Sequence, residues 1–497
     1  MKRDVIIIGT GVAGMTAGVT LAKEGLGVLA LEQSPQPGGL MRRFARAGLS
    51  FPTGVHSVGS LDAGQTLWRC FKYMGVLGRV DLVRMNADGF VEYSFPGWSF
   101  RVPIGHEAFR ARLIERFPSE RKAVDAFFSD LQNTTAHFPL HTIEVRPMRP
   151  LDETQRGSLQ DYLDSLTACS ELKLVLSASN FFYGMSPSEC PLYVHLLVLD
   201  SFLNGAWRVD ERRVLLAAAF EEQLKSLGGE IRCNARVVSI DSTNGEIRGV
   251  SLANGERLEA PRVIYTGHPR LLSSLCADRA MRPAFRERVR DLPETPGLLG
   301  VAIDWRGADC PVGLTDSFLF QSADVHRPYE QRLLDDRAMP HLVYCAASPA
   351  GSSRTRAAVA LSPSPVEEWS RWAETRTGQR PADYGDIKAR LAERTLGTVK
   401  ARWPEEAAHL TAVDTFTPLT FRDYTLTPTG SAYGLKKSVA AGPSGRIAHD
   451  TRIKGLSLAG QSVLLPGVVG TTISSIAACA RILGERYLVE RIARETE

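Results

Sequence analysis

The N-terminal residues alternate between strand-like and helix-like patterns of apolar positions. Residues 4–8 and 28–31 are short, mostly apolar runs without helical spacing, and each has the length of a buried strand. Residues 12–24, which lie between them, are predicted to form a helix that Gly25 ends. The pattern therefore predicts a strand–helix–strand unit, in which a helix joins two parallel strands.

The rest of the chain divides into a mainly helical part and a part that mixes strands with helices. Residues 91–224 are predicted to be mainly helical, with helices at 107–116, 121–135, 159–166, 171–176 and 214–227. Strands are predicted at 230–233, 235–240, 247–252, 257–260 and 263–267, and Asn254-Gly255 favours a hairpin between two of them. Residues 295–415 mix strands at 300–304, 342–346 and 357–362 with helices at 366–375 and 384–396.

A glycine motif joins the first strand to the first helix. Gly9, Gly11 and Gly14 follow a G-x-G-x-x-G pattern, with Val12 and Ala13 between the last two glycines. Gly9 permits the tight turn, Gly11 has no side chain to block a pyrophosphate, and Gly14 lets the helix pack closely on the strand. Because the helix N-terminus directs N–H groups at phosphates, the motif predicts a dinucleotide site.

Glu32 and the residues after it extend this site. Glu32 ends the second strand and is placed to accept hydrogen bonds from ribose hydroxyls. Gln33 follows, and Gly38 and Gly39 then offer further backbone amides to a dinucleotide, with Arg42 or the arginine beside it able to reach its charge. A simple Pro-Gly turn would also explain this segment.

A second glycine-rich turn lies near the C-terminus, between a strand predicted at 453–458 and a helix predicted at 473–491. Its candidate binding residues are Gly460, Gln461, Gly467, Val468, Val469 and Thr471. A glycine-rich turn that leads into a helix N-terminus is an anion site. If this turn and the N-terminal motif bind the same cofactor, the domain that holds them is discontinuous.

In these segments the sequence resembles the FAD-dependent family of amine oxidases, phytoene desaturases, carotenoid isomerases and retinol saturases. The resemblance implies that both N-terminal glycine motifs cradle FAD, that the backbone at Val237 brackets the adenine, and that the C-terminal turn closes over the flavin. The arginine that usually follows the glycine doublet is Leu40 here. The resemblance therefore leaves open which arginine contacts the phosphates.

Two further segments favour the branch of this family that acts on polyenes. Residues 51–59, which include His56, look like the segment after the glycine doublet in retinol saturases and carotenoid isomerases. Residues 431–434, which include Tyr433, look like a segment of phytoene desaturases. We expect His56 and Tyr433 near the flavin as the candidate catalytic residues. His56 could equally be a half-buried structural histidine, and for Tyr433 simple packing is slightly favoured over a place facing the flavin ring.

The residues between 174 and 207 are rich in aliphatic and aromatic side chains. A core helix explains this concentration, and the wall of an apolar tunnel or a membrane-touching face would also do so. The chain has no G-x-S-x-G, no H-E-x-x-H and no clustered pair of carboxylates. That absence suits hydride transfer at flavin N5, in which the cofactor carries the chemistry.

Composition adds the domain plan and excludes several classes. A chain of 497 residues exceeds one compact core, so we expect two domains. Together with the motifs, the resemblance implies an α/β fold: a discontinuous Rossmann-like FAD-binding domain (1–90, 225–295 and 415–497) with an inserted α+β substrate-binding domain (91–224 and 296–414). The net charge of +4 is spread along the chain, which argues against nucleic acid. The eight cysteines show no metal-binding or disulfide spacing, so we expect no metal site and a cytoplasmic location, with peripheral membrane contact left open.

Three functions remain. The first is an FAD oxidoreductase that desaturates, saturates or isomerises a lipophilic polyene or isoprenoid. The second is a flavin amine oxidase acting on a small amine, and the third is a non-enzymatic prenyl-binding relative. No second dinucleotide motif is visible, so the external electron donor or acceptor is not identified by the sequence.

Overall fold

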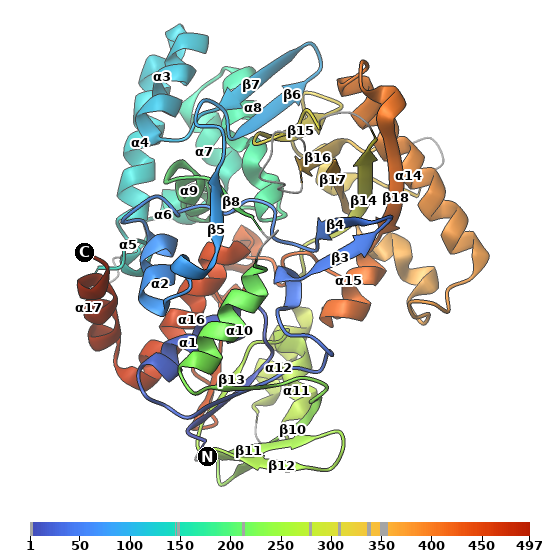
Figure 1. The fold of residues 1–497 in the computed structure, drawn as a ribbon. Helices are drawn as coiled ribbons and strands as arrows, with labels where there is room; N and C mark the ends of the chain where they lie inside the picture. The colour runs from blue at the N-terminus through green and yellow to red at the C-terminus, as the bar shows by residue number, and fades with distance from the viewer. Residues whose placement is uncertain are drawn as a thin grey trace.

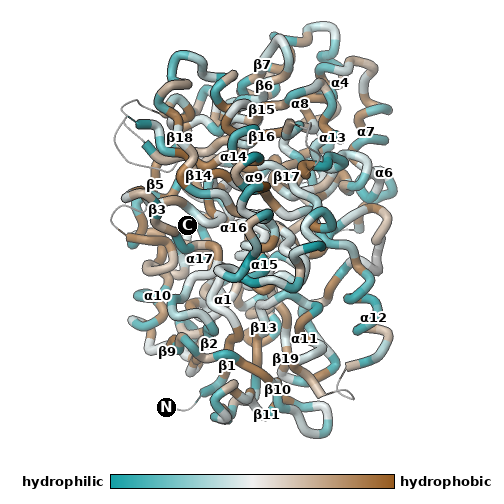
Figure 2. The backbone as a smooth tube through the Cα atoms, turned by 90° about the vertical axis from the view of Figure 1, so that its right-hand side faces the viewer, coloured by the Kyte–Doolittle hydropathy of each residue, from teal (hydrophilic) through white to brown (hydrophobic). Residues whose placement is uncertain are grey.

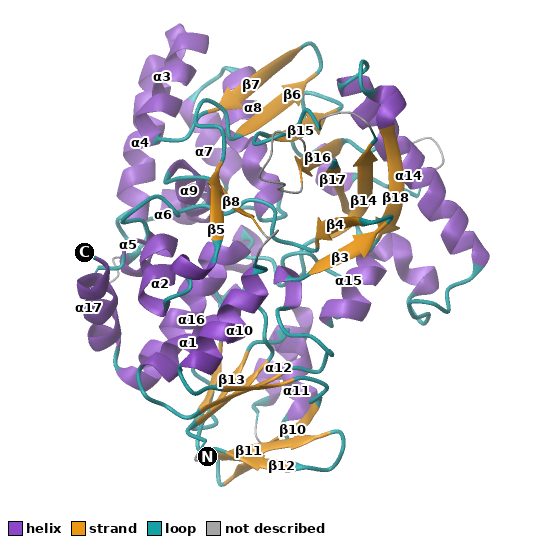
Figure 3. Cartoon of the chain, in the orientation of Figure 1, coloured by secondary structure: helices purple, strands orange, loops and turns teal. Residues whose placement is uncertain are grey.

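The computed structural model describes residues 3–144, 146, 150–210, 214–277, 281–306, 310–334, 339–347 and 356–497. The fold is of the predicted α/β class, with a five-stranded sheet at one end of the molecule and a seven-stranded sheet at the other (Figure 1). Helices cover both sheets (Figure 3). The assignment of residues to two domains stays a prediction.

The five-stranded sheet is parallel and collects strands from both ends of the chain. Its strands are β19 (Leu456–Leu458), β13 (Val263–Tyr265), β1 (Val5–Ile8), β2 (Val28–Leu31) and β9 (Glu230–Arg232), in that spatial order. Ile7 pairs with Ile264 on one side and with Ala30 on the other. Since β19 pairs with β13, the sheet brings the C-terminal turn to the same edge as the N-terminal glycine motif.

Side chains alternate across β1 and bury both of its faces. Val5 and Ile7 pack into a core with α1 (Val12–Lys23), α10 (Leu216–Ser226) and α16 (Gly467–Leu483). Ile6 packs on the opposite face with the antiparallel strands β10 (Val237–Thr243), β11 (Glu246–Leu252) and β12 (Arg257–Glu259). The predicted hairpin at Asn254-Gly255 is confirmed, with Gly255 at a φ of +87°. In Figure 2 the brown, hydrophobic colour marks β1 and β13 inside the molecule.

The seven-stranded sheet is mixed. Its spatial order is β18 (Leu410–Phe416), β14 (Gly297–Trp305), β17 (Ala357–Ser364), β16 (Leu342–Ala347), β15 (Asp316–Phe320), β6 (Val91–Phe95) and β7 (Trp98–Val102). One face packs against α4 (Arg121–Thr135) and α9 (Leu192–Leu203), and the other against α14 (Ala382–Arg402). The sheet and α9 line one wall of the cavity described below, through Leu298, Tyr344 and Leu361 of the sheet and Leu197 and Val198 of α9.

Several predicted elements differ from the structure. Residues 91–102 were expected in a helical part but form the β6–β7 hairpin, because Val91, Tyr93 and Phe95 alternate with more polar positions at strand spacing. The helix predicted at 473–491 begins earlier, at Gly467, and is interrupted at Gly484, where φ is +98°. The segment predicted as a helix at 366–375 forms 3₁₀ turns over Val366–Trp372.

The remaining helices and strands belong to none of the sheets described above. They are β3 (Arg43–Arg46), β4 (Leu49–Pro52), α2 (Thr66–Met74), β5 (Asp81–Arg84), α3 (His106–Arg116), α5 (Pro139–Thr142), α6 (Glu153–Arg156), α7 (Leu159–Leu166), α8 (Ser170–Ser177), β8 (Trp207–Asp210), α11 (Pro269–Leu275), α12 (Pro283–Asp291), α13 (Arg327–Glu330), α15 (Pro418–Thr425) and α17 (Glu485–Thr496). In the part of the chain that the structure describes, no helix combines the length and apolar character needed to span a bilayer.

Candidate active site

The turn between β1 and α1 has the backbone geometry of a phosphate site. Gly9 has a φ of +100°, and a Cβ on Gly14 would lie 1.9 Å from the carbonyl oxygen of Gly9. A Cβ on Gly11, by contrast, would meet no atom within 4 Å. The first hydrogen bond of α1 runs from Met15 N to Gly11 O at 3.0 Å. The N–H groups of residues 12–14 therefore point out of the helix N-terminus, and Gly11 leaves room in front of them.

Glu32 fixes the turn through Thr10. The Thr10 hydroxyl donates to Glu32 Oε2 at 2.6 Å, and the N–H of Ser34 donates to Oε1 at 2.9 Å. The N–H of Gly38 donates in turn to the Thr10 hydroxyl at 3.2 Å. A carboxylate has about four lone-pair positions, so Glu32 retains capacity for a ribose hydroxyl. The sequence did not reveal that Glu32 also ties both glycine motifs together.

The second glycine motif lies directly against the first. A Cβ on Gly39 would come within 3.0 Å of Gly11 Cα, and Gly38 has a φ of +117°. Arg42 turns back so that its Nε donates to Gly39 O at 3.0 Å. Leu40 instead lines the cavity described below, and Gln33 is exposed. It stays a prediction that Arg42, Arg43 or Gln33 contacts a cofactor.

Val237 lies at the start of β10, next to the end of β2. The N–H of Ala235 donates to Glu32 O at 2.8 Å, and the N–H of Asn234 donates to Ser34 O at 3.0 Å. Val237 packs in the same cluster as Leu31. The structure therefore places Val237 beside the acidic end of β2, where the adenosine part of a dinucleotide is expected.

The C-terminal turn meets the N-terminal one. A Cβ on Gly460 would lie 3.7 Å from the Cβ of Ala13, and the N–H of Gly460 donates to Ser474 Oγ at 3.0 Å. Gln461 follows at a half-buried position. The helix α16 then begins at Gly467, whose φ is +76°, and its first residues line the cavity. Thr471 is buried in the first turns of α16. The predicted cofactor residues thus come from three distant parts of the chain to one edge of the sheet.

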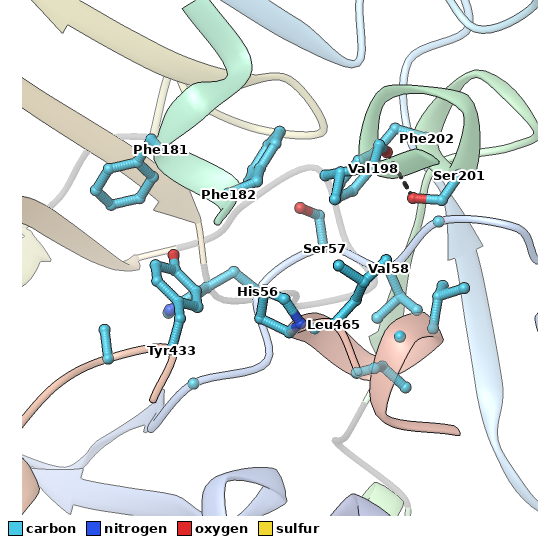
Figure 4. A pocket seen from close by; sticks show the side chains of 18 of the residues that line it. His56, Ser57, Val58, Phe181, Phe182, Val198, Ser201, Phe202, Tyr433 and Leu465 are labelled. Atoms are coloured by element: carbon cyan, nitrogen blue, oxygen red, sulfur yellow. Dashed lines mark hydrogen bonds between the residues drawn. The ribbon is translucent and has the colours of Figure 1, made fainter. Parts of the chain in front are cut away.

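A cavity of about 1090 Å³ of space, part of it open to solvent, lies between the N-terminus of α16 and the seven-stranded sheet. Figure 4 shows Phe181, Phe182, Val198 and Phe202 arranged around it. The lining residues are Leu40, Thr53, Gly54, His56, Ser57, Val58, Gly59, His141, Phe181, Phe182, Leu197, Val198, Ser201, Phe202, Leu298, Tyr344, Leu361, Phe421, Ala432, Tyr433, Leu465, Pro466, Gly467, Val468, Val469, Gly470 and Ile473.

The apolar concentration at 174–207 serves two purposes. Leu192, Leu196 and Leu203 are buried in the core beneath the sheet, whereas Leu197 and Val198 on the same helix line the cavity. Both the core and the tunnel-wall interpretations therefore describe part of this segment.

His56 and Tyr433 both line the cavity. Burial lowers the pKa of His56 to about 4, so its imidazole is neutral at pH 7. Its Nδ1 has no hydrogen-bond partner within the described part of the chain. Burial raises the pKa of Tyr433, so its hydroxyl keeps its proton. The two side chains are placed to contact a bound molecule by hydrogen bonding, and a catalytic role for either stays a prediction.

A buried ionic network behind the cavity was not evident in the sequence. Tyr344 lines the cavity and donates from its hydroxyl to Asp316 Oδ2 at 2.7 Å, while Arg208 pairs with the other oxygen of Asp316. Arg208 and Asp316 are almost fully buried. Residues so far apart in sequence meet only through the fold, and charged residues are usually expected at the surface.

Comparison with known proteins connects this geometry to a family. The family model described as flavin containing amine oxidoreductase matches residues 12–302. The all-trans-retinol 13,14-reductase of Macaca fascicularis is 25% identical over 97% of this chain and 86% of its own length. The neurosporene-forming phytoene desaturase of Cereibacter sphaeroides is 23% identical over 99% of this chain and 98% of its own length. A solved structure of an oxidoreductase from Methanosarcina mazei has the same fold, with a TM-score of 0.67 at 15% identity over 96% of this chain and 99% of that one.

Proposed function

Because the chain belongs to the family of flavin-containing amine oxidoreductases, we propose that it is an FAD enzyme that saturates a carbon–carbon double bond of a lipophilic polyene. Saturation is favoured over desaturation because the retinol reductase is slightly more similar to the chain than the phytoene desaturase is. Desaturation is the reverse transfer and is an outcome that the experiment below detects.

The character of the cavity carries this proposal. Its walls are formed by aromatic and aliphatic side chains, and the described residues that line it include no Asp, Glu, Lys or Arg. A protonated amine that enters such a cavity would lose its hydration without gaining a carboxylate partner, which is costly. A polyene would instead gain from burial of its apolar surface. The cavity therefore favours a polyene over the small amine.

The residues at the sheet edge fit FAD. The N–H groups at the start of α1, with the open space at Gly11, would hold the pyrophosphate, and Glu32 would bind the ribose. The N-terminus of α16 would stabilise negative charge on the reduced ring. When bound, FAD supplies the hydride chemistry. The chain's own part is to hold the substrate against that ring and to exclude water, with His56 and Tyr433 as proposed contacts.

Filling the cavity tests the proposal. Val198→Trp places a large side chain on the cavity wall of α9, whereas Val238→Trp makes the same change at an exposed position of β10. We expect Val198→Trp to retain FAD but to lose conversion of all-trans-retinol supplied in liposomes, and Val238→Trp to match the wild type. The absorption spectrum of the polyene reports the reaction.

Two outcomes would contradict the proposal. Equal conversion by wild type and Val198→Trp would show that the polyene does not occupy this cavity. Oxidation of small amines with release of hydrogen peroxide, together with no change in any polyene, would instead support the amine oxidase.

A further inference from the structure

A buried carboxylate on α9 joins two histidines from different elements. Asp200 accepts at Oδ1 from His106 Nε2 and at Oδ2 from His141 Nε2, each at 2.7 Å. The amide of Asn204 donates to Oδ2 at 2.7 Å as well. His106 begins α3 and His141 lies in α5, so the fold alone brings the three ionisable groups together.

The two ends of this array face different environments. His141 lines the cavity and has a side chain only 7% exposed, whereas that of His106 is 24% exposed. Asp200 lies between them with a side chain 9% exposed. Burial alone would raise the pKa of Asp200, but hydrogen bonds from both histidines outweigh burial and lower it to about 2. A permanent negative charge is therefore held between the cavity and the protein surface.

The position of His141 is also fixed through its backbone. The hydroxyl of Thr66 at the start of α2 donates to the carbonyl oxygen of His141. The imidazole Nε2 is held by Asp200, so Nδ1 is the atom through which His141 can exchange a proton with the cavity. A carboxylate that orients one ring nitrogen and stabilises the imidazolium is the arrangement that general acid–base catalysis uses.

We propose that His141 is the proton donor of the reaction in this cavity, with Asp200 and His106 as its positioning residues. The inference rests on the proposed saturation of a polyene. Reduced FAD, when bound, would supply a hydride to one carbon of the double bond, and His141 would give the proton on its Nδ1 to the electron pair left on the other carbon. Two C–H bonds would form as the π bond and the His141 N–H bond break, and the two electrons gained by the polyene would come from the cofactor. Asp200 stays hydrogen-bonded to Nε2 of both His141 and His106, so His141 takes up its next proton at Nδ1 from water that enters the cavity.

The role of His141 is tested in single turnovers of the dithionite-reduced holoenzyme with all-trans-retinol in liposomes. We expect His141→Ala to slow turnover by about 100-fold or more, the size of a lost general acid, while FAD content and polyene binding stay at the wild-type level. Added imidazole should restore part of the rate, and the solvent deuterium isotope effect should increase. His106→Ala should cause a smaller fall with a similarly increased isotope effect.

The control is His409→Ala, which removes an exposed histidine after α14 and should behave as wild type. A His141→Ala enzyme that turns over at the wild-type rate, or that loses rate only together with FAD and is not rescued by imidazole, would overturn the role of His141. If the wild type itself leaves the polyene unchanged, the proposed saturation is wrong and the role of His141 fails with it.

Discussion

Gly11 and Gly14 belong to one motif, but the structure gives them different tasks, and one matched pair of substitutions separates these tasks. Gly11→Ala adds a methyl group that no protein atom contacts within 4 Å. Gly14→Ala adds the same group 1.9 Å from the carbonyl oxygen of Gly9. The first change should therefore affect only a bound dinucleotide, and the second should affect the fold itself.

The expected sizes follow from these contacts. In Gly14→Ala, better helix propensity stabilises the protein by about 1 kcal/mol, whereas overpacking against backbone destabilises it by about 1–3 kcal/mol. We expect an overpacking cost at the upper end of that range, because a methyl group has no rotamer that relieves the contact. Gly11 stands at the helix N-cap with a φ of −66°, which alanine adopts, so the apoprotein should lose less than about 1 kcal/mol. Its FAD affinity should fall by at least about 100-fold, or roughly 3 kcal/mol.

Urea unfolding of the apoproteins and fluorescence titration with FAD measure the two effects. Wild-type FAD affinity in Gly11→Ala would refute the phosphate site at this turn. An apoprotein of Gly14→Ala as stable as the wild type would refute the close-packing role of Gly14.

Three further changes test other parts of the structure. Glu32→Ala should weaken FAD binding by about 1.5–3 kcal/mol in the same titration, and unchanged affinity would exclude the ribose contact. Gly467→Leu should lower the flavin midpoint potential by roughly tens of millivolts or lose the flavin, while Val468→Ala should stay near wild type. Equal potentials and equal FAD occupancy in the three proteins would show that this turn does not contact the flavin. Burial lowers the pKa of His195 from 6.5 to about 4. As the pH falls, the unfolded state therefore binds a proton at this histidine before the folded state does, and the free energy of unfolding should fall between about pH 6.5 and pH 4. At pH 5 the loss from His195 should be about 2 kcal/mol. His195→Gln should remove that part of the pH dependence of urea unfolding, and an unchanged slope would contradict it.

The sequence could predict the parts of the fold that depend on local rules. Gly9 and Gly14 stand where the backbone requires glycine, so their spacing indicated the strand, turn and helix directly. The Asn254-Gly255 hairpin followed from turn chemistry in the same way. The helix end near Gly484 was missed because the apolar spacing continues on both sides of it, and only the left-handed backbone there breaks the helix.

The candidate site could be predicted only in part for a related reason. The local sequence of the glycine turns predicts a dinucleotide site, whereas the cavity depends on tertiary packing. His141 of α5 and Asp200 of α9 are brought together only by the fold, and Arg208 pairs with Asp316 across it in the same way. Residue spacing holds no signal for such contacts, since each pair belongs to different elements.

Transfer of hydrogen between FAD and a polyene in the apolar cavity is the activity that the proposals above share. The most direct measurement is a single anaerobic turnover, with equal amounts of reduced holoenzyme and all-trans-retinol, followed by the flavin absorbance and by the mass of the extracted polyene. We expect the wild-type flavin to be reoxidised at the same rate at which the polyene gains two hydrogens, and neither change to occur in Val198→Trp. Flavin that stays reduced while the polyene keeps its mass would refute hydrogen transfer in this cavity.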